Sequence, residues 1–432
     1  MIARARTRAQ ISALPWYDHH ERKRIAIELM PNELQIPSVG AGESQRFAVR
    51  LALFYGAVFG LVGTHLPFFP VWLKAIDIDP QWIGIIIAVP SITRFTTLPF
   101  ITAAAERQRA LRMALIATAF ATTIGFAILG LLREPVAVLA VYALTAVLWT
   151  PTVPMTDGYA LKAVTRYGLN YGPLRLWGSA AFVVGALGCG LLIQIIAARH
   201  VIWVIVAMAA CGALASLALL PLEAPPRGDL DARPAPKLLR DAGFLTIITA
   251  SALIQGSHAA YYTFASIAWQ GEGFGGLTIA VLWVLGVLAE IVLFALSPRF
   301  RWEPATLVIL AGFVAAARWI VIAQSPPLAL LAIVQLSHGI SFGLTLVATM
   351  SLMQRHVPAA FIARAQGYLA ASTGIVMAST AVVSGAIYAR IGQGIYVVMA
   401  TMALVAVAVM MVGRRRLASR AGAQPHNVAS GG

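Results

Sequence analysis

The chain has 432 residues, of which 59% are hydrophobic and only 11% are charged. Soluble globular proteins carry about 25% charged residues, so this composition excludes an ordinary soluble domain and indicates a protein that crosses a membrane several times. A net charge of +15 would suggest a nucleic-acid partner in a soluble protein, but here the placement of the charges decides their meaning. Cys189 and Cys211 both lie in apolar segments, which indicates neither a disulfide framework nor a metal site.

The first part of the chain, residues 1–46, is polar and basic. No apolar core of a signal peptide follows its first arginines. We interpret this segment as a disordered cytoplasmic tail. Met30 is an alternative initiator, in which case residues 1–29 are not translated.

Apolar segments of membrane-spanning length then follow one another along the chain. We expect twelve of them, near 47–73, 82–104, 112–132, 136–158, 172–197, 201–220, 242–269, 277–297, 305–323, 328–353, 362–389 and 392–412. A proline-rich and basic linker at 221–241 divides them into six and six. The sequence therefore predicts an all-α integral membrane protein with twelve transmembrane helices. We expect a six-helix bundle at 47–220, a cytoplasmic linker, a second bundle at 242–412, and a cytoplasmic tail at 413–432.

Cationic residues are distributed unevenly among the predicted loops. They gather in the two tails and in the loops that lead from even-numbered to odd-numbered segments, whereas the opposite loops hold only Lys74, Arg133, Arg199 and Arg390. The positive-inside rule then places both termini in the cytoplasm. The basic charge is therefore a topology signal, and we expect a monomer in the lipid bilayer of a bacterial inner membrane with no nucleic-acid partner.

The two halves of the chain repeat weakly. Residues 63–69, Gly-Thr-His-Leu-Pro-Phe-Phe, match residues 256–262, Gly-Ser-His-Ala-Ala-Tyr-Tyr, at an offset of 193 positions. Arg299 is a loose counterpart of Glu106 at the same offset. Such a repeat indicates two halves related by a pseudo-two-fold axis along the membrane normal, with the binding site between them.

The stretch from Asp157 to Ser179 places a carboxylate at the end of one apolar segment and the Arg175 guanidinium at the start of the next. A charge inside the bilayer is costly unless it is paired or wet, so these residues are candidates for a polar cavity. The alternative is that both lie near the cytoplasmic surface and extend toward water. Trp149 and Trp177 are correspondingly either walls of the site or interfacial belt residues.

Other ionisable residues lie within the predicted segments, namely Arg94, Glu290, Arg318 and His338. Intramembrane ionisable groups are functional by default, and histidine titrates near neutrality. We therefore interpret Glu290, Arg318 and His338, on three consecutive segments, as one titratable cluster. The alternatives are a structural ion pair between Glu290 and Arg318 and a hydrogen-bonded core histidine at position 338.

Aromatic residues accompany the two repeated histidines. His65 shares a helical face with Phe68, Phe69 and Trp72, and His258 precedes Tyr261 and Tyr262. Each histidine either lines the cavity or packs in an aromatic stripe. Trp283 precedes Glu290 by seven positions and shares its face.

These residues resemble the major facilitator superfamily, in the proton-coupled branch that holds lactose permease and the phenylpropionate permeases. Residues 171–179, Tyr-Gly-Pro-Leu-Arg-Leu-Trp-Gly-Ser, are similar to the branch's signature in its fifth segment, and the spacing from Asp157 to Arg175 resembles the sugar-binding pair of lactose permease. Glu290, Arg318 and His338 resemble that permease's ionisable residues in segments 8 to 10. The resemblance covers about residues 47–412 and implies two pseudo-symmetric six-helix bundles of the MFS fold.

The chain also departs from that branch. Lactose permease has a further glutamate where this chain has Ser341, so the resemblance leaves Glu290, His338 or Asp157 as the proton carrier. The superfamily's loop motif between segments 2 and 3 is degraded here, because its glycine and aspartate are missing around Glu106 and Arg107.

We predict a secondary active transporter that carries a small organic solute, an aromatic or other carboxylate, together with protons by alternating access. We expect no cofactor, because the proton gradient supplies the energy for transport. The residues expected at the substrate are His65, Arg94, Asp157, Arg175, Trp177, His258, Tyr261, Tyr262 and Trp283, and those expected in proton coupling are Glu290, Arg318 and His338. Proton-driven efflux of drugs or metabolites, and symport of sugars or nucleosides, are alternatives within the same fold.

A membrane hydrolase is the alternative of another class. Residues 339–343, Gly-Ile-Ser-Phe-Gly, match the Gly-x-Ser-x-Gly motif. That motif needs a strand-to-helix turn, whereas here it lies inside an apolar helical segment. We therefore expect no enzyme. The sequence also lacks a phosphate-binding P-loop, so this chain does not drive transport with ATP by itself.

Overall fold

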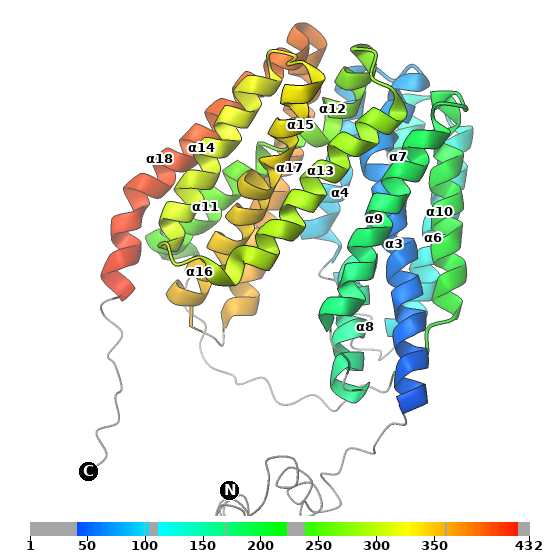
Figure 1. Ribbon diagram of the computed structural model, residues 1–432, viewed down its shortest axis with the longest axis horizontal. Coiled ribbons are helices and arrows are strands. Elements are labelled where there is room, and N and C mark those ends of the chain that lie inside the picture. Colours follow the sequence, from blue (N-terminus) through cyan, green and yellow to red (C-terminus); the bar gives the residue numbers. More distant parts are fainter. Residues whose placement is uncertain are drawn as a thin grey trace, which may run out of the picture.

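The computed structural model describes residues 41–98, 100–102, 111–167, 169, 171–222, 238–358 and 361–421. Helices are the only regular secondary structure within these ranges (Figure 1). Residues 1–40 of the predicted N-terminal tail, most of the predicted linker, and residues 422–432 of the predicted C-terminal tail lie outside them. The all-α prediction is confirmed for the described part of the chain.

The first group of helices precedes the linker. It comprises α3 (Ala41–Ala75), α4 (Pro80–Thr96), α6 (Leu111–Leu131), α7 (Pro135–Trp149), α8 (Thr152–Tyr167), α9 (Tyr171–Leu192), the 3₁₀ turn η2 (Ala198–His200) and α10 (Val201–Leu217). Acidic caps begin two of these helices: Asp79 Oδ1 accepts from the backbone N–H groups of Gln81 and Trp82, and Glu134 accepts from that of Ala137. A proline follows each cap at the first helical position, where no N–H is needed.

The second group follows the linker. It comprises η3 (Leu238–Arg240), α11 (Ala242–Gly256), α12 (Ala259–Gly271), α13 (Gly276–Leu296), η4 (Ser297–Arg299), α14 (Pro304–Ile322), α15 (Leu328–Leu336), the π-helical turn η5 (Gly339–Leu344), α16 (Thr345–His356), α17 (Ile362–Ile391), η7 (Gly392–Gly394) and α18 (Ile395–Ala421).

Within the described residues, eight helical stretches are long and apolar enough to cross a membrane. One of these stretches, Arg364–Arg415, contains most of both α17 and α18. This result supports a protein that crosses the membrane many times. The number twelve and the boundaries of the two domains stay predictions.

Three of the predicted segments are interrupted where polar residues or proline interfere with the helix. Pro151 separates α7 from α8, because proline cannot donate the helical hydrogen bond. Between α11 and α12, Ser257 Oγ and His258 Nδ1 both hydrogen-bond the carbonyl of Ile254. The third break follows His338, where the chain adopts the π-turn η5. The second and third breaks place His258 and His338 at helix ends, within the polar site described below.

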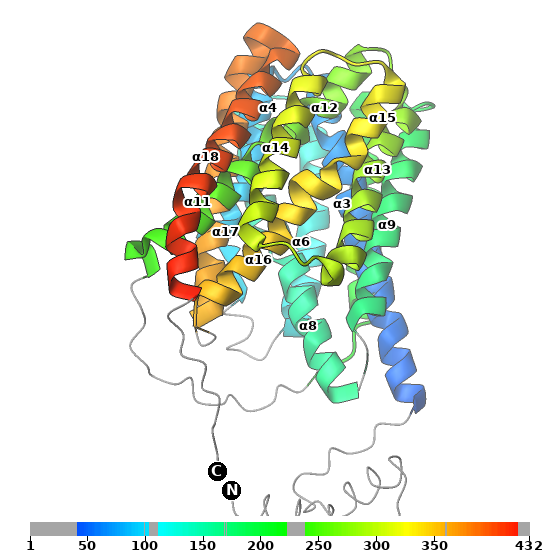
Figure 2. The same ribbon diagram turned by 60° about the vertical axis from the view of Figure 1, so that its left-hand side comes forward.

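The two groups of helices stand side by side (Figures 1 and 2). We call the end at which α3 begins and α18 ends the terminal face, and the other end the opposite face. Close to the opposite face the groups approach through glycines: a Cβ atom on Gly84 would lie 2.6 Å from the Ala381 carbonyl oxygen, and one on Gly190 would lie 2.7 Å from the Gly276 carbonyl oxygen. These contacts join α4 to α17 and α9 to α13.

Helices α9 and α13 diverge toward the terminal face (Figure 1). Trp177, in the part of α9 nearest that face, is 61% exposed. The two groups are therefore joined most tightly near the opposite face.

Candidate functional site

Three helices of the second group bring together Glu290 on α13, Arg318 on α14, and His338 just after α15. Arg318 Nη1 lies 2.7 Å from His338 Nδ1, and His338 Nε2 lies 2.8 Å from Glu290 Oε1. A guanidinium can only donate hydrogen bonds, so His338 Nδ1 accepts and the ring proton is on Nε2. His338 Nε2–H therefore donates to the carboxyl group of Glu290. The result is a continuous chain from guanidinium through imidazole to carboxyl.

The guanidinium of Arg318 is almost completely buried, at 2% exposure. Its central carbon lies 4.6 Å from the ring centre of Tyr261 and 4.7 Å from that of Trp319. Contact with aromatic faces stabilises a cation that has lost its water, and Glu290, which is linked to Arg318 through His338, supplies compensating charge when it is ionised. Arg318 is thus held from several sides.

Gln335 also belongs to this cluster, although the sequence analysis did not select it. Its Oε1 atom accepts a hydrogen bond of 2.8 Å from Arg318 Nη2 and one of 3.0 Å from the Tyr261 hydroxyl. The side chain is completely buried. A neutral amide is not conspicuous in an apolar segment in the way that a charged residue is. The sequence signal for Gln335 is its position three residues before His338, which places both on the same helical face.

His258 occupies the break between α11 and α12. Its Nδ1 atom donates to the Ile254 carbonyl at 2.9 Å, and its Nε2 atom accepts from Ser341 Oγ at 3.2 Å. Its ring lies 5.3 Å from that of His338. Ser341 is the central residue of the Gly-x-Ser-x-Gly match, but it lies in the π-turn η5, and the described residues contain no strand from which a nucleophile elbow could form.

An aromatic wall adjoins the cluster. Tyr262 stacks on Trp283 with ring centres 6.0 Å apart, and Tyr261 lies 4.9 Å from Trp283. Trp283 Nε1 donates to Ser266 Oγ at 2.9 Å, which fixes the indole ring. Tyr261, Tyr262 and Trp283 were all predicted at the substrate, and the structure places them together.

Arg94 lies on α4, in the first group of helices. Its side chain is exposed, and among the described residues it has neither a hydrogen-bond partner nor an ion-pair partner. Its charge nevertheless acts on the hydroxyl of Tyr262, which belongs to the second group. Arg94 therefore lies between the two groups, close to the aromatic wall.

Four other predicted residues belong to the first group. His65 is buried, its Nε2 atom lies 3.2 Å from the Tyr142 hydroxyl, and its ring stacks on Phe69. Asp157 Oδ1 accepts a 2.7 Å hydrogen bond from Tyr55. Trp177 is exposed, and the side chain of Arg175 lies outside the described residues. The structure thus places His65 and Asp157 apart from the cluster of Glu290, Arg318 and His338.

The surroundings of the two repeated histidines are related by the same offset of 193 positions. Around His65 lie the rings of Phe69, Phe126 and Trp149, and around His258 lie those of Tyr262, Trp319 and Phe342. Each residue of the first set corresponds in order to one of the second. The positions that correspond to Arg318 and His338 are Gly125 and Thr145, so the first group contains the aromatic cage without the ionisable residues.

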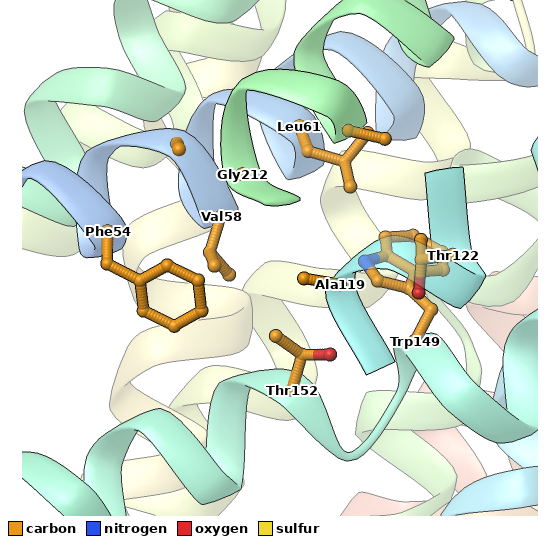
Figure 3. A pocket seen from close by; sticks show the side chains of 10 residues that line it. Phe54, Val58, Leu61, Ala119, Thr122, Trp149, Thr152 and Gly212 are labelled. Atoms are coloured by element: carbon orange, nitrogen blue, oxygen red, sulfur yellow. The ribbon is translucent and has the colours of Figure 1, made fainter. Parts of the chain in front are cut away.

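A small cavity of about 20 Å³ lies inside the first group, between α3, α6, α8 and α10 (Figure 3). Its lining includes Trp149 and Thr122, and the buried Thr122 hydroxyl has no hydrogen-bond partner in the described ranges. This volume holds about one water molecule, which could satisfy that hydroxyl. It is too small for an organic solute, and Trp149 is the one residue in its lining that the sequence suggested as a wall of the site.

Residues 48–400 match the MFS_1 like family. The chain is 31% identical over 364 residues to the probable 3-phenylpropionic acid transporter of Escherichia coli (strain K12), which covers 82% of this chain and 94% of the relative. It is also 29% identical over 314 residues to the maltose permease of Geobacillus stearothermophilus, covering 71% of this chain and 78% of that relative.

Solved structures share the fold. The nucleoside transporter NupG superposes with a TM-score of 0.74 and 15% identity, over 85% of this chain and 99% of that one. A bacterial homolog of the human lysosomal transporter Spinster gives a TM-score of 0.63 and 13% identity, over 88% and 99%. At these identities the likeness shows the fold alone. The family match and the extended similarity to a phenylpropionic acid transporter show that this chain belongs to the major facilitator superfamily, as a multi-pass membrane transporter of the phenylpropionate permease type and not an enzyme.

Proposed function

We propose that this transporter imports a small carboxylate, aromatic or otherwise, together with protons. The observation that carries the proposal is the Arg94 guanidinium, which has no ion-pair or hydrogen-bond partner within the described part of the chain, beside the wall of Tyr261, Tyr262 and Trp283. A guanidinium keeps its charge at every working pH and binds a carboxylate through two parallel hydrogen bonds. An aromatic wall next to it suits a ring or another apolar group on the same solute.

Arg318 is less suited to bind the substrate directly. It is buried, and its two terminal nitrogens already donate to His338 and Gln335. We therefore divide the two roles: Arg94 binds the anion, and Arg318 belongs to the proton-coupling cluster. Asp157, Arg175 and Trp177 stay proposed contributors from the first group, whereas His65 serves packing in this proposal.

The proton in this proposal is carried by Glu290. His338 Nδ1 is occupied by Arg318, so a second ring proton would require that hydrogen bond to break. The carboxyl group of Glu290 has a second oxygen that can take up a proton without disturbing His338. Glu290 is also the more exposed of the two, at 20% of its side chain against 8% for His338.

Transport would then follow from the joint binding of the anion and the proton. The substrate anion compensates Arg94 and the proton neutralises Glu290, so the two together add no net charge to the site, which favours the rearrangement of the two helix groups. Release of the proton leaves an ionised carboxyl group that is held by His338 and Arg318. Rocking of the groups about their glycine contacts would expose the site alternately to each side.

The test is uptake of radiolabelled 3-phenylpropionate by purified protein in liposomes. Accumulation should require an inward proton gradient and should collapse with a protonophore. Accumulation that is indifferent to the gradient would refute symport, and uptake only in the reverse direction would favour efflux. Maltose is the comparison solute, because a maltose permease is among the relatives; accumulation of maltose instead of the acid would favour the sugar alternative.

A further inference from the structure

We propose that Gln335 is a positioning residue: its amide holds Arg318 in place without neutralising it, so that the guanidinium charge acts on His338 and Glu290. The consequence for transport rests on the proton coupling proposed above. The structural claim, that the residue at position 335 sets the protonation of Glu290, can be tested without any transport measurement.

The orientation of the Gln335 amide is fixed by its partners. Both Arg318 Nη2 and the Tyr261 hydroxyl donate to Oε1. If the amide were turned over, its NH₂ group would face the guanidinium, which offers only donors. The oxygen of Gln335 is therefore the atom that anchors Arg318.

This arrangement leaves two donors unsatisfied. Gln335 Nε2 and Arg318 Nε are both buried, and neither has a hydrogen-bond partner among the residues that the structure describes. Nε and Nη2 lie on the same edge of a guanidinium, and a carboxylate can accept from both at once, whereas a single amide oxygen accepts here from Nη2 alone. A glutamate at position 335 could thus satisfy Arg318 more completely than the glutamine does. Hydrogen bonding to Arg318 therefore does not by itself explain why position 335 holds a neutral residue.

The absence of charge at position 335 explains why a glutamine rather than a glutamate occupies it. A carboxylate at 335 would give Arg318 a permanent counter-ion and would remove most of its effect on the link through His338 to Glu290. The other ionisable groups around the cluster would be the same as in the wild type. The ionisable groups that surround the cluster from the neighbouring elements are His258, Tyr261, Tyr262, Glu290, His338, Tyr396 on α18, and Arg94 on α4.

Two variants of nearly the same size separate this role from simple packing. Gln335→Glu adds a negative charge beside Arg318, which favours a proton on Glu290. Gln335→Met removes the acceptor but adds no charge, so Arg318 is released from Gln335 and can pair more directly with Glu290, which favours the ionised carboxyl group. The two variants should therefore shift the titration of Glu290 in opposite directions, whereas a packing role predicts no such difference in sign.

The measurement is infrared spectroscopy of the purified full-length protein, in which a protonated carboxyl group gives its own C=O band. The band of Glu290 is identified by its loss in Glu290→Gln, made in each of the three backgrounds. We expect its titration to move to higher pH by about one unit or more in Gln335→Glu, and to lower pH in Gln335→Met. Titrations that coincide with the wild type, or that move in the same direction, would overturn the proposal.

Each variant decides the question alone if the other fails to fold, since the sign of its shift is predicted. Uptake in liposomes is then measured on the same preparations. In Gln335→Glu the pH profile of uptake should move in the alkaline direction along with the infrared band. If the infrared shifts appear but wild-type uptake needs no proton gradient, the role of Gln335 stands and the proposed symport fails.

Discussion

Arg318 and His338 are joined by a 2.7 Å hydrogen bond from Nη1 to Nδ1, and this bond fixes the position of the ring proton of His338. The ring therefore presents an N–H group to Glu290 and nothing that could accept a proton from it. In the proposed mechanism, Glu290 is therefore the group that binds and releases a proton, with Arg318 acting on it through the imidazole ring.

The first prediction concerns Glu290→Gln. The amide has the same size and keeps an oxygen that can accept from His338 Nε2, so the protein should fold and bind substrate as the wild type does. Because the amide cannot release a proton, accumulation driven by a pH gradient should be lost, while exchange of labelled for unlabelled substrate at equal concentrations should persist. Both activities are measured in liposomes at the same pH. Full accumulation by this variant would contradict the role of Glu290.

The second prediction concerns Arg94→Gln and is designed as a double comparison. Loss of a charged hydrogen-bonding partner costs about 1.5–3 kcal/mol, so the affinity for 3-phenylpropionate should fall about ten- to a hundredfold. The uncharged 3-phenylpropanamide should bind wild type weakly, and Arg94→Gln should weaken its binding little further. Binding is measured by calorimetry in detergent.

Arg318→Gln is unsuitable as the control for Arg94, because it would disrupt a buried network. Arg166→Gln removes an exposed cation from the end of α8 and should leave both affinities unchanged. Equal loss of acid and amide affinity in Arg94→Gln would mean that Arg94 does not contact the carboxylate.

The sequence predicts much of this site because a charge inside an apolar segment is conspicuous. Glu290, Arg318 and His338 could be selected from their positions in consecutive segments, and the structure brings them into contact. Gln335 and Ser341 could not be selected in this way, since neutral polar residues are common in membrane helices. Their roles depend on the direction in which each side chain points.

Two of the three helix breaks, at His258 and at His338, leave little trace in the hydropathy of the sequence. Hydropathy predicts one continuous segment at 242–269, because the polar residues Gln255, Ser257 and His258 occupy only a short part of it. The break there results from competition between two side chains for the Ile254 carbonyl, which a hydropathy average does not detect. The break before α8 is different, because Pro151 itself is a sequence signal for an interrupted helix just before Asp157.

The third prediction concerns the glycine contact between α4 and α17. A Cβ atom on Gly385 would lie 2.6 Å from the Pro80 carbonyl oxygen, which is closer than such atoms can approach. Gly385→Ala should therefore force α17 away from α4 and open the opposite face. Gly367→Ala is the matched control on the same helix, because nothing lies within 4 Å of the Cβ position there.

The separation is measured by electron paramagnetic resonance between spin labels on Lys74 and Gln270, which are exposed near the opposite face, with Cys189 and Cys211 replaced by serine. The distribution of distances should move to larger values in Gly385→Ala and stay unchanged in Gly367→Ala. An unchanged distribution in Gly385→Ala would show that these helices do not form the closed contact.

The fourth prediction separates the two histidine cages. His65 hydrogen-bonds Tyr142 within the aromatic core, so His65→Phe should keep the ring stacking but leave the Tyr142 hydroxyl buried and unpaired. A buried hydroxyl without a partner lowers the free energy of unfolding by about 1–3 kcal/mol, so the thermal midpoint of the purified protein should fall. Because this cage lacks counterparts of Arg318 and His338, the pH profile of uptake should stay unchanged.

His258→Phe should behave differently, because His258 contacts Ser341 and packs on His338. We expect its pH profile of uptake to shift, whatever happens to its thermal midpoint. The double variant His65→Phe with Tyr142→Phe removes both partners of the hydrogen bond and should recover most of the lost stability. A shifted pH profile in His65→Phe would mean that the first cage takes part in proton transfer, and the assignment of coupling to the second group alone would then be wrong.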